Sequence, residues 1–345
     1  MPSNIATSYD VNAAQGAREN LESLLKTVEP TETPLYSTLS QSAAPKATLN
    51  EWLVDSLEDP VGASGNIDGV DLDLSSAKNL IESRARLTNR VATLRDYFAV
   101  GRQAEMVDVA PGGTNGLFNA SKAKSLIQLK RSIEVAIASG NDQSAGSSSA
   151  GATMAGLGVW SDPTATGNTF DTSAKEAFRA VSGSRVSLAS LTEDGLRGLL
   201  QSVYTASGAK SNFKLYCGPA VMNKITDYTR ASITDNPSYQ FTQDVSGKSL
   251  VRSILTYVSD WGSIDLIPDL FLGRFDGTPS GTDTALGTVN TDRAYLIPDD
   301  DTVSLKFLEG ISVVQLPDNG GGKRAFSEAM LTLRVSNPRA LGSII

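Results

Sequence analysis

Histidine is absent from this 345-residue sequence, and Cys217 is the only cysteine. The first absence removes the commonest general acid and base and the commonest metal ligand. A single cysteine excludes an intrachain disulfide and a metal site built from several thiolates. Catalysis by histidine, and metal sites built from histidine or several cysteines, are therefore excluded.

Long apolar runs are also missing. No stretch of eighteen apolar residues is present, so the sequence predicts no membrane-spanning helix, and the N-terminus lacks the basic start and apolar block of a secretion signal. Aromatic residues make up only 6 %, against 30 glycines and 14 prolines, which indicates a globular chain rich in turns. The length suits about two domains. A net charge of −8 argues against holding nucleic acid by bulk electrostatics.

The clearest regular element is a long amphipathic helix expected over about 119–139. Its apolar residues recur every three or four positions, and charged residues, Glu134 among them, are assigned to the other faces. Ser139 and Gly140 are typical of a helix end. Twenty such residues span roughly 30 Å, enough to run through a whole domain.

The N-terminal part is expected to be mostly extended. Residues 17–28 predict a short helix, and residues 29–39, with two prolines, predict an extended stretch in which Leu35 and Tyr36 are anchors. This stretch is either a surface linker or an arm laid across another molecule. Residues 48–100 then predict a β-ribbon, with strands at 49–54 and 84–100, that needs a partner surface because two strands alone are marginal.

Charge is segregated along this ribbon and the helix that follows. Residues 51–82 contain eight acidic residues and one basic residue, a net charge of −7, whereas residues 83–131 contain nine basic and three acidic residues, a net charge of +6. Adjacent blocks of opposite sign would set the register of a head-to-tail assembly. A solvated acidic loop beside a basic helix face would give the same pattern, so both interpretations stay open.

The C-terminal half predicts an α/β region and returning strands. Residues 144–158 are rich in Gly, Ala and Ser, but Met154, Leu157 and Trp160 favour a packed loop. A capping box from Ser190 to Glu193 begins a helix that ends near residue 206. The other expected elements are a strand at 213–217, a helix from Pro219 to about 228, and strands at 249–258, 263–267, 293–297, 303–307 and 330–335.

Three stretches resemble ligand sites without meeting their requirements. Gly247-Lys248-Ser249 lacks the earlier glycine of a phosphate-binding loop, because position 242 is Thr242. Residues 68–74 lack the spacing and final glutamate of a calcium loop, and the three aspartates at 299–301 are more typical of a charged turn. Cys217 follows an apolar strand and predicts a buried, inert thiol. We therefore expect no enzyme, no cofactor and no metal.

The ordered motifs resemble one family. These are SLLKTVEPTETPLYSTLSQ (23–41), NEWLVDSL (50–57), SKAKSLIQLKRSIEVAIASGN (121–141), MAGLGVW (154–160), FKLYCGPAVMNKI (213–225) and the C-terminal AYLIPDDDTVSLKFLEG and EAMLTLRVSNPRALGSI. Taken in order, they resemble the major capsid proteins of tailed bacteriophages with the Hong Kong 97 (HK97) fold, in the major head protein branch.

The resemblance implies an α+β fold in five parts. They are an N-terminal arm (1–47), an extended β-ribbon loop (48–100), a peripheral domain with the long helix as its spine (101–185), an axial α/β domain (186–292), and C-terminal strands that complete the peripheral domain (293–345). It implies self-assembly into pentamers and hexamers of an icosahedral shell around double-stranded DNA, within a virion assembled in the bacterial cytoplasm. The partners would be a portal and possibly a decoration protein, and DNA would be bound without sequence specificity.

Two departures from the family bear on these expectations. The chain begins almost directly at the arm, so we expect a separate scaffolding protein or none, and Lys78 is the only lysine of residues 51–82 that could form an isopeptide cross-link. Two alternatives are an encapsulin-like shell with protein cargo and a soluble carboxylate-dependent α/β enzyme. The residues expected at contacts between subunits are Leu35, Tyr36, Asp68, Asp71, Asp73, Arg84, Arg86, Lys122, Lys130 and Arg131.

Overall fold

The computed structural model describes residues 31–57, 68–69, 84–107, 116–208, 212–235, 255–272, 293–318 and 320–345. The helix expected at 17–28, the calcium-like residues 70–74, Lys78 and the segment at 247–249 lie outside these ranges. Within them the fold is mixed. No described helix is long and apolar enough to span a membrane.

Seven α-helices and three short 3-10 helices are described. The α-helices are α2 (Pro34–Thr38), α3 (Arg102–Met106), α4 (Leu117–Ala138), α5 (Leu157–Trp160), α6 (Ser173–Glu176), α7 (Glu193–Ser207) and α8 (Pro219–Asp235). The 3-10 helices are η2 (Ser182–Ser184), η3 (Leu188–Ser190) and η4 (Pro338–Ala340).

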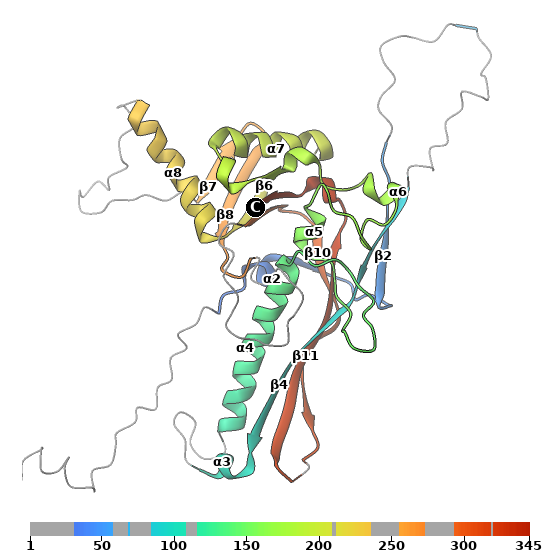
Figure 1. Cartoon of the computed structure of the whole chain (residues 1–345), viewed down its shortest axis with the longest axis vertical. Helices are drawn as coiled ribbons and strands as arrows, with labels where there is room; N and C mark the ends of the chain where they lie inside the picture. Colours follow the sequence, from blue (N-terminus) through green and yellow to red (C-terminus); the bar gives the residue numbers. More distant parts are fainter. Residues whose placement is uncertain are drawn as a thin grey trace, which may run out of the picture. The chain divides into compact units, whose positions relative to one another are not determined.

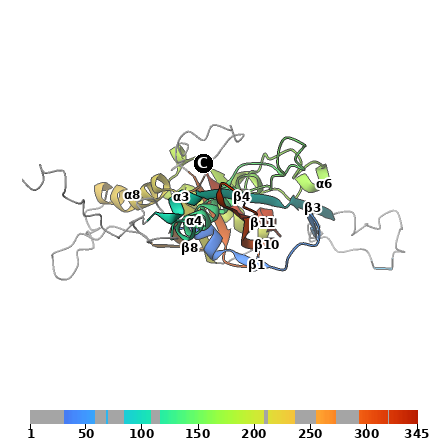
Figure 2. The ribbon, with the colours of Figure 1, turned by 90° about the horizontal axis from the view of Figure 1, so that it is seen from below.

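The strands form three sheets. A four-stranded sheet has the order β1 (Ser40–Ser42), β10 (Val303–Leu316), β11 (Gly322–Val335) and β4 (Ala92–Gly101). A six-stranded sheet has the order β5 (Arg185–Val186), β12 (Gly342–Ile344), β9 (Ala294–Pro298), β6 (Asn212–Cys217), β8 (Gly262–Pro268) and β7 (Thr256–Ser259). The third sheet contains β2 (Leu49–Val54) and β3 (Ala85–Arg90). β1 pairs in parallel with β10 (Figure 2).

The chain divides into two compact units. Among the described residues, the first unit holds 97–107, 116–125, 313–318 and 320–326, and the second holds the others. The boundary falls inside α4, β4, β10 and β11, so each unit is described by itself below.

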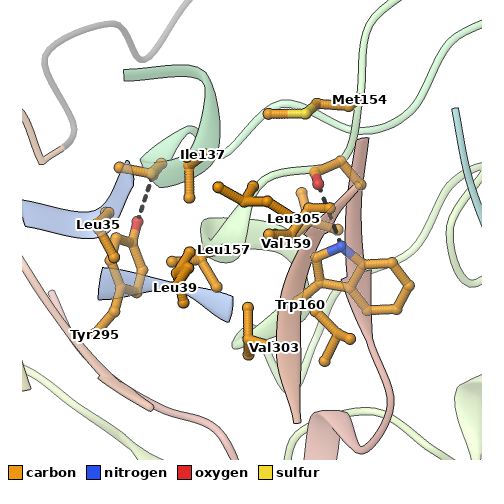
Figure 3. Packing of buried hydrophobic residues seen from close by; sticks show 14 of the residues in the cluster. Leu35, Leu39, Ile137, Met154, Leu157, Val159, Trp160, Tyr295, Val303 and Leu305 are labelled. Carbon is orange, nitrogen blue, oxygen red and sulfur yellow. Dashed lines mark hydrogen bonds between the residues drawn. The ribbon is translucent and has the colours of Figure 1, made fainter. Parts of the chain in front are cut away.

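The second unit contains two hydrophobic clusters. One lies between α7 and the six-stranded sheet, where Leu196, Leu200 and Val203 pack with Phe213 and Leu215 (Figure 1). The other gathers α2, the C-terminal part of α4, α5 and the strands β9, β10 and β11 (Figure 3). The packing of the amphipathic helix α7 on the six-stranded sheet confirms the α/β character expected for the region that contains α7, β6 and β8.

The C-terminal end of α4 is held by several other segments. The Tyr295 hydroxyl donates to the Ala138 carbonyl oxygen at 2.9 Å (Figure 3), and the Gly158 amide donates to the Ser139 carbonyl oxygen at 3.0 Å. The last carbonyl groups of a helix have no partner inside it, so these donors stabilise the helix end. Met154, Leu157 and Trp160 are buried beside it, which confirms the packed loop expected there.

The long helix is confirmed, with one error about its faces. It spans Leu117–Ala138, and Leu129, Ile133 and Ile137 are fully or almost fully buried. Glu134 was assigned to another face, yet its side chain is completely buried. The buried face of the helix is about 100° wide and includes position 134 next to Ile133. Glu134 can be buried there because its side chain has hydrogen-bond partners outside the helix.

Two expectations for the N-terminal half were wrong. Residues 34–38 are not extended, because Pro34 stands at the first position of α2, where proline has no amide to lose and its fixed φ suits a helix. The single strand expected at 84–100 is two strands that part at Val91. β3 pairs with β2, and β4 joins the other sheet, while the Val91 amide donates to the Thr48 carbonyl oxygen at 2.8 Å.

Several element ends also differ. The helix α7 is capped by Thr192, whose hydroxyl accepts from the Gly195 amide at 3.1 Å, and not by Ser190, whose hydroxyl donates to the Ser187 carbonyl oxygen within η3. The helix α8 continues to Asp235 rather than ending near 228. The two C-terminal strands expected at 303–307 and 330–335 are parts of much longer strands, β10 and β11. Strand β2 has the bounds predicted for it.

Candidate inter-subunit contact sites

The base of the acidic ribbon is the two-stranded sheet β2–β3. Its antiparallel register places Leu53 opposite Arg86, and two ion pairs join the strands: Arg84 Nε to Asp55 Oδ2 at 2.8 Å and Arg86 Nη1 to Glu51 Oε2 at 3.4 Å. All four side chains remain substantially exposed. Exposed ion pairs contribute about 0–1 kcal/mol each, so these charges add little to the stability of the subunit.

One face of β2 is buried and the other is open. Trp52 is buried, with its ring centroid 5.7 Å from that of Trp160, whereas Leu53 is 69 % exposed and Leu57 just beyond the strand is 99 % exposed. Alternating residues of a strand point to opposite faces, so Glu51 and Leu53 share the open side. Two exposed leucines among acidic residues suit a surface that another molecule covers.

The first unit is held together by an ion pair and aromatic contacts. Lys323 Nζ lies 3.0 Å from Glu105 Oε1 and 5.7 Å from the centroid of the Phe118 ring, and Phe98 packs against Phe118 at 5.4 Å. Gly322 has a φ of +127°, and a Cβ there would lie 2.2 Å from the Val100 carbonyl oxygen, so only glycine fits this approach.

The same unit carries much of the exposed apolar surface. Of the twelve large hydrophobic side chains that are exposed in the described ranges, five belong to it: Tyr97, Met106, Val107, Val314 and Leu316. Its exposed charged side chains are mostly basic: Arg102, Lys122, Lys124, Lys323 and Arg324. Two backbone amides, from Gly320 and Gly322, hold the pKa of its one exposed described acid, Asp318, below the ordinary value. This unit therefore offers an apolar and basic surface.

The candidate contact residues occupy different environments. Asp68 is exposed in a turn with Gly69, whose φ is +80°, and Lys122 and Lys130 are exposed on α4. Arg131 is half-buried, with its guanidinium carbon 5.2 Å from the centroid of the Phe271 ring. Asp71 and Asp73 lie outside the described residues.

Leu35 and Tyr36 are engaged within their own chain. Leu35 is completely buried, and the half-buried Tyr36 packs edge-on against Phe307, with 6.3 Å between ring centroids. These two side chains fix α2 to its own subunit. The exposed candidates that remain available to another molecule are Asp68, Arg84, Arg86, Lys122 and Lys130.

Nothing in the described residues assembles a reactive centre. Cys217 is buried, and burial raises the pKa of its thiol to about 12, which confirms an inert cysteine. Asp299 accepts from Lys214 Nζ at 2.6 Å, and Asp300 accepts from the Thr302 amide at 2.8 Å, as expected of a charged turn. No group of three or more metal-ligating side chains occurs in the described ranges.

The sequence did not predict the burial of two polar residues, Asn89 and Glu134. Asn89 accepts from the Ala155 amide at 2.8 Å and donates to the carbonyl oxygens of Ala155 and Leu333 at 3.1 and 2.7 Å. Glu134 accepts from two backbone amides of α2. Asn89 Oδ1 also accepts from the amide of the adjacent Arg90. All other hydrogen-bond partners of these two side chains are more than sixty residues away in the sequence, so no local pattern marks either residue.

The arrangement of sheets, long helix and open charged surfaces defines a shell-forming subunit of the Hong Kong 97 fold. The chain belongs to the SU10 major capsid protein family, whose model matches residues 2–345. It is a major capsid protein of a tailed phage, a structural protein and not an enzyme, and it forms part of the virion as many copies in a shell. This confirms the resemblance seen in its motifs.

Solved capsid structures share the fold at low sequence identity. A chain from the capsid of cyanophage A-1(L) has a TM-score of 0.66 at 12 % identity, covering 97 % of this chain and 98 % of that one. The capsid structure of cyanophage P-SCSP1u gives 0.61 at 10 % identity, with coverage of 100 % and 96 %. The mature capsid of bacteriophage PhiM1 gives 0.57 at 12 % identity, with coverage of 99 % and 98 %. No curated protein matches this chain.

Proposed function

We propose that this capsid protein assembles as pentamers and hexamers into an icosahedral shell that encloses double-stranded DNA. The observation that carries the proposal is the match of the capsid family model to residues 2–345. A net charge of −8 fits a wall that confines DNA without binding its sequence. Assembly would take place in the host cytoplasm, with a portal, a separate scaffolding protein and possibly a decoration protein as partners.

The proposed division of labour follows the five parts expected from the sequence. Residues 1–47 form the N-terminal arm, 48–100 the extended loop, 101–185 and 293–345 the peripheral domain, and 186–292 the axial domain. The two hydrophobic clusters support two cores, one of α7 and the six-stranded sheet and the other of α4, β10 and β11. The strands β9 and β12 of the C-terminal segment lie in the six-stranded sheet, so they would belong to the axial domain. Each cluster is a core of its own, as separate domains require.

Subunits would be held in register by opposite charges. The acidic segment 51–82, with a net charge of −7, is proposed to lie on the basic surface of a neighbouring copy that includes Lys122 and Lys130. Exposed Leu53 and Leu57 at the base of that segment would add apolar burial. Complementary charge mainly directs orientation and rate of association, while many modest contacts repeated around a shell give its strength.

The proposal is tested by expressing the chain alone and together with a candidate scaffolding protein. Sedimentation would separate particles from subunits, and negative-stain electron microscopy would show their form. Closed shells or rings of five and six subunits are expected in at least one condition. A folded monomer that persists in both conditions contradicts the proposal.

A further inference from the structure

A buried carboxylate connects the long helix to the short helix α2. Glu134 is completely buried, its Oε1 accepts from the Leu35 amide at 2.6 Å, and its Oε2 accepts from the Tyr36 amide at 2.7 Å. These amides belong to the first turn of α2, where a helix has no acceptors of its own. One side chain of α4 thus fixes the start of α2.

A second buried carboxyl group lies beside the first. Asp269, which follows β8, is 2 % exposed; its Oδ1 accepts from the Phe271 amide at 2.8 Å, and its charge acts on the carboxyl group of Glu134. Asp269 Oδ2 is buried and has no hydrogen-bond partner among the described residues. Two carboxyl groups can hydrogen-bond to each other only if one of them carries a proton.

The surroundings offer little compensation for a second negative charge. The titratable side chains that face the pair are Tyr216, whose hydroxyl is 2.5 Å from that of Thr38, and the buried thiol of Cys217. The guanidinium group of Arg131 lies over the Phe271 ring, and Lys214 is bound to Asp299. Burial, and next the charge of Asp269, raise the pKa of Glu134 from 4.5 to about 8, and burial raises the pKa of Asp269 too.

We propose that Glu134 and Asp269 form a protonation-dependent latch that holds α2 against α4 while the pair shares one proton and loosens when that proton is lost. The latch therefore controls how firmly α2 is held against α4. The direction follows from proton linkage. Between pH 4.5 and about 8 the closed latch binds more protons than the open state, so rising pH favours opening, and the effect levels off above pH 8.

The test is hydrogen–deuterium exchange of the full chain, followed by mass spectrometry of peptides that cover residues 34–39. Rates at pH 6, 7, 8 and 9 are corrected for the intrinsic pH dependence of amide exchange. In the wild type, the opening constant should rise by up to about tenfold per pH unit between pH 6 and 8 and then level off. A peptide covering β9 should show no such rise, because its strand partners carry no such pair.

Three variants separate the latch from general destabilisation. In Asp269→Asn the amide can donate to Glu134 without a proton, so the rise with pH should be markedly smaller, whereas Asp301→Asn removes the same charge from an exposed turn and should behave as the wild type. In Glu134→Gln the peptide covering residues 34–39 should exchange faster at every pH, because the glutamine NH2 group faces a backbone amide and cannot accept from it. Its opening constant should not rise with pH, because glutamine does not titrate. A wild-type opening constant that does not change with pH, an equal rise in Asp269→Asn, or a persisting rise in Glu134→Gln would each overturn the proposal.

Discussion

At the scale of single residues, stability depends on a few buried polar groups that connect distant segments. Asn89 is the clearest example, because its completely buried amide joins β3, the loop at Ala155 and β11. A buried donor or acceptor left without a partner costs about 1–3 kcal/mol. The residue therefore acts as a connector between three segments.

Replacing Asn89 by alanine should lower the free energy of unfolding by roughly 2–3 kcal/mol, since the Ala155 amide and the Leu333 carbonyl oxygen lose their bonds to its side chain, while the Ala155 carbonyl oxygen still accepts from Trp160 Nε1. Denaturant unfolding of the isolated subunit, followed by tryptophan fluorescence, measures the change. Asn119→Ala, at an exposed position of α4, is the matched control and should change stability by less than about 0.5 kcal/mol. Equal losses in the two variants would show that the Asn89 network is not important.

The residues that the sequence located correctly are those with local patterns. Leu129, Ile133 and Ile137 follow helical spacing, so their burial was predictable. Asn89 and Glu134 carry polar side chains whose burial depends on partners 66 and 99 residues away. A single sequence contains no signal for such pairs, and Glu134 was therefore placed on the wrong face.

At the scale of elements, the end of α4 and the loop that packs on it form one joint. Gly156 and Gly158 approach the backbone at Ser139 and Gly140, and a Cβ at Gly156 would lie 2.3 Å from the Ser139 carbonyl oxygen. Real side chains do not tolerate such a distance, so the loop can cap the helix only with glycine at this position. This is the physical reason for the glycines in the motif at 154–160.

Gly156→Ala should therefore destabilise the subunit by about 1–3 kcal/mol, because the added methyl group must push the loop away from α4. Gly151→Ala in the same loop is the control, since a Cβ there meets nothing within 4 Å and its φ is not positive. Thermal unfolding of both variants measures the difference. If the Gly151 variant loses as much stability as the Gly156 variant, then flexibility and not the close approach explains the effect.

Element ends were harder to foresee than element types. The sequence predicted β2 with its observed bounds and the existence of α4, α7 and α8. It missed α2, because a five-residue helix with proline at its start has no periodicity of its own and is fixed by Glu134 from another helix. It also missed the parting of β3 and β4 at Val91, which depends on two different partner strands.

At the scale of the whole molecule, the subunit has surfaces that make sense only in an assembly. Leu53 and Leu57 are exposed beside acidic residues, and the first unit exposes apolar and basic side chains together. The capsid family was already indicated by ordered motifs, whereas the contact residues, most of them chosen for their charge, stay a prediction. The reason is that contacts between copies leave no trace in the contacts of one chain.

Charge exchange tests the proposed register between subunits. Lys122→Glu with Lys130→Glu, and separately Asp71→Lys with Asp73→Lys, should each reduce the yield of particles by roughly tenfold while the subunit stays folded, because like charges then face each other at several contacts per subunit. Combining the four substitutions in one chain should restore assembly in part. Particle yield is measured by sedimentation and folding by circular dichroism.

The control for the Lys122 and Lys130 variant makes the same change in net charge at two other positions. Lys46→Glu with Arg197→Glu changes the net charge equally at exposed positions outside the proposed contact, so its particle yield should match the wild type. Assembly of the wild type should also weaken between 0.1 and 1 M salt, as the Debye length falls from about 10 to about 3 Å. Normal particles from both lysine and aspartate variants, or no recovery in the combined variant, would mean that shape and apolar burial set the register, with charge playing no directing part.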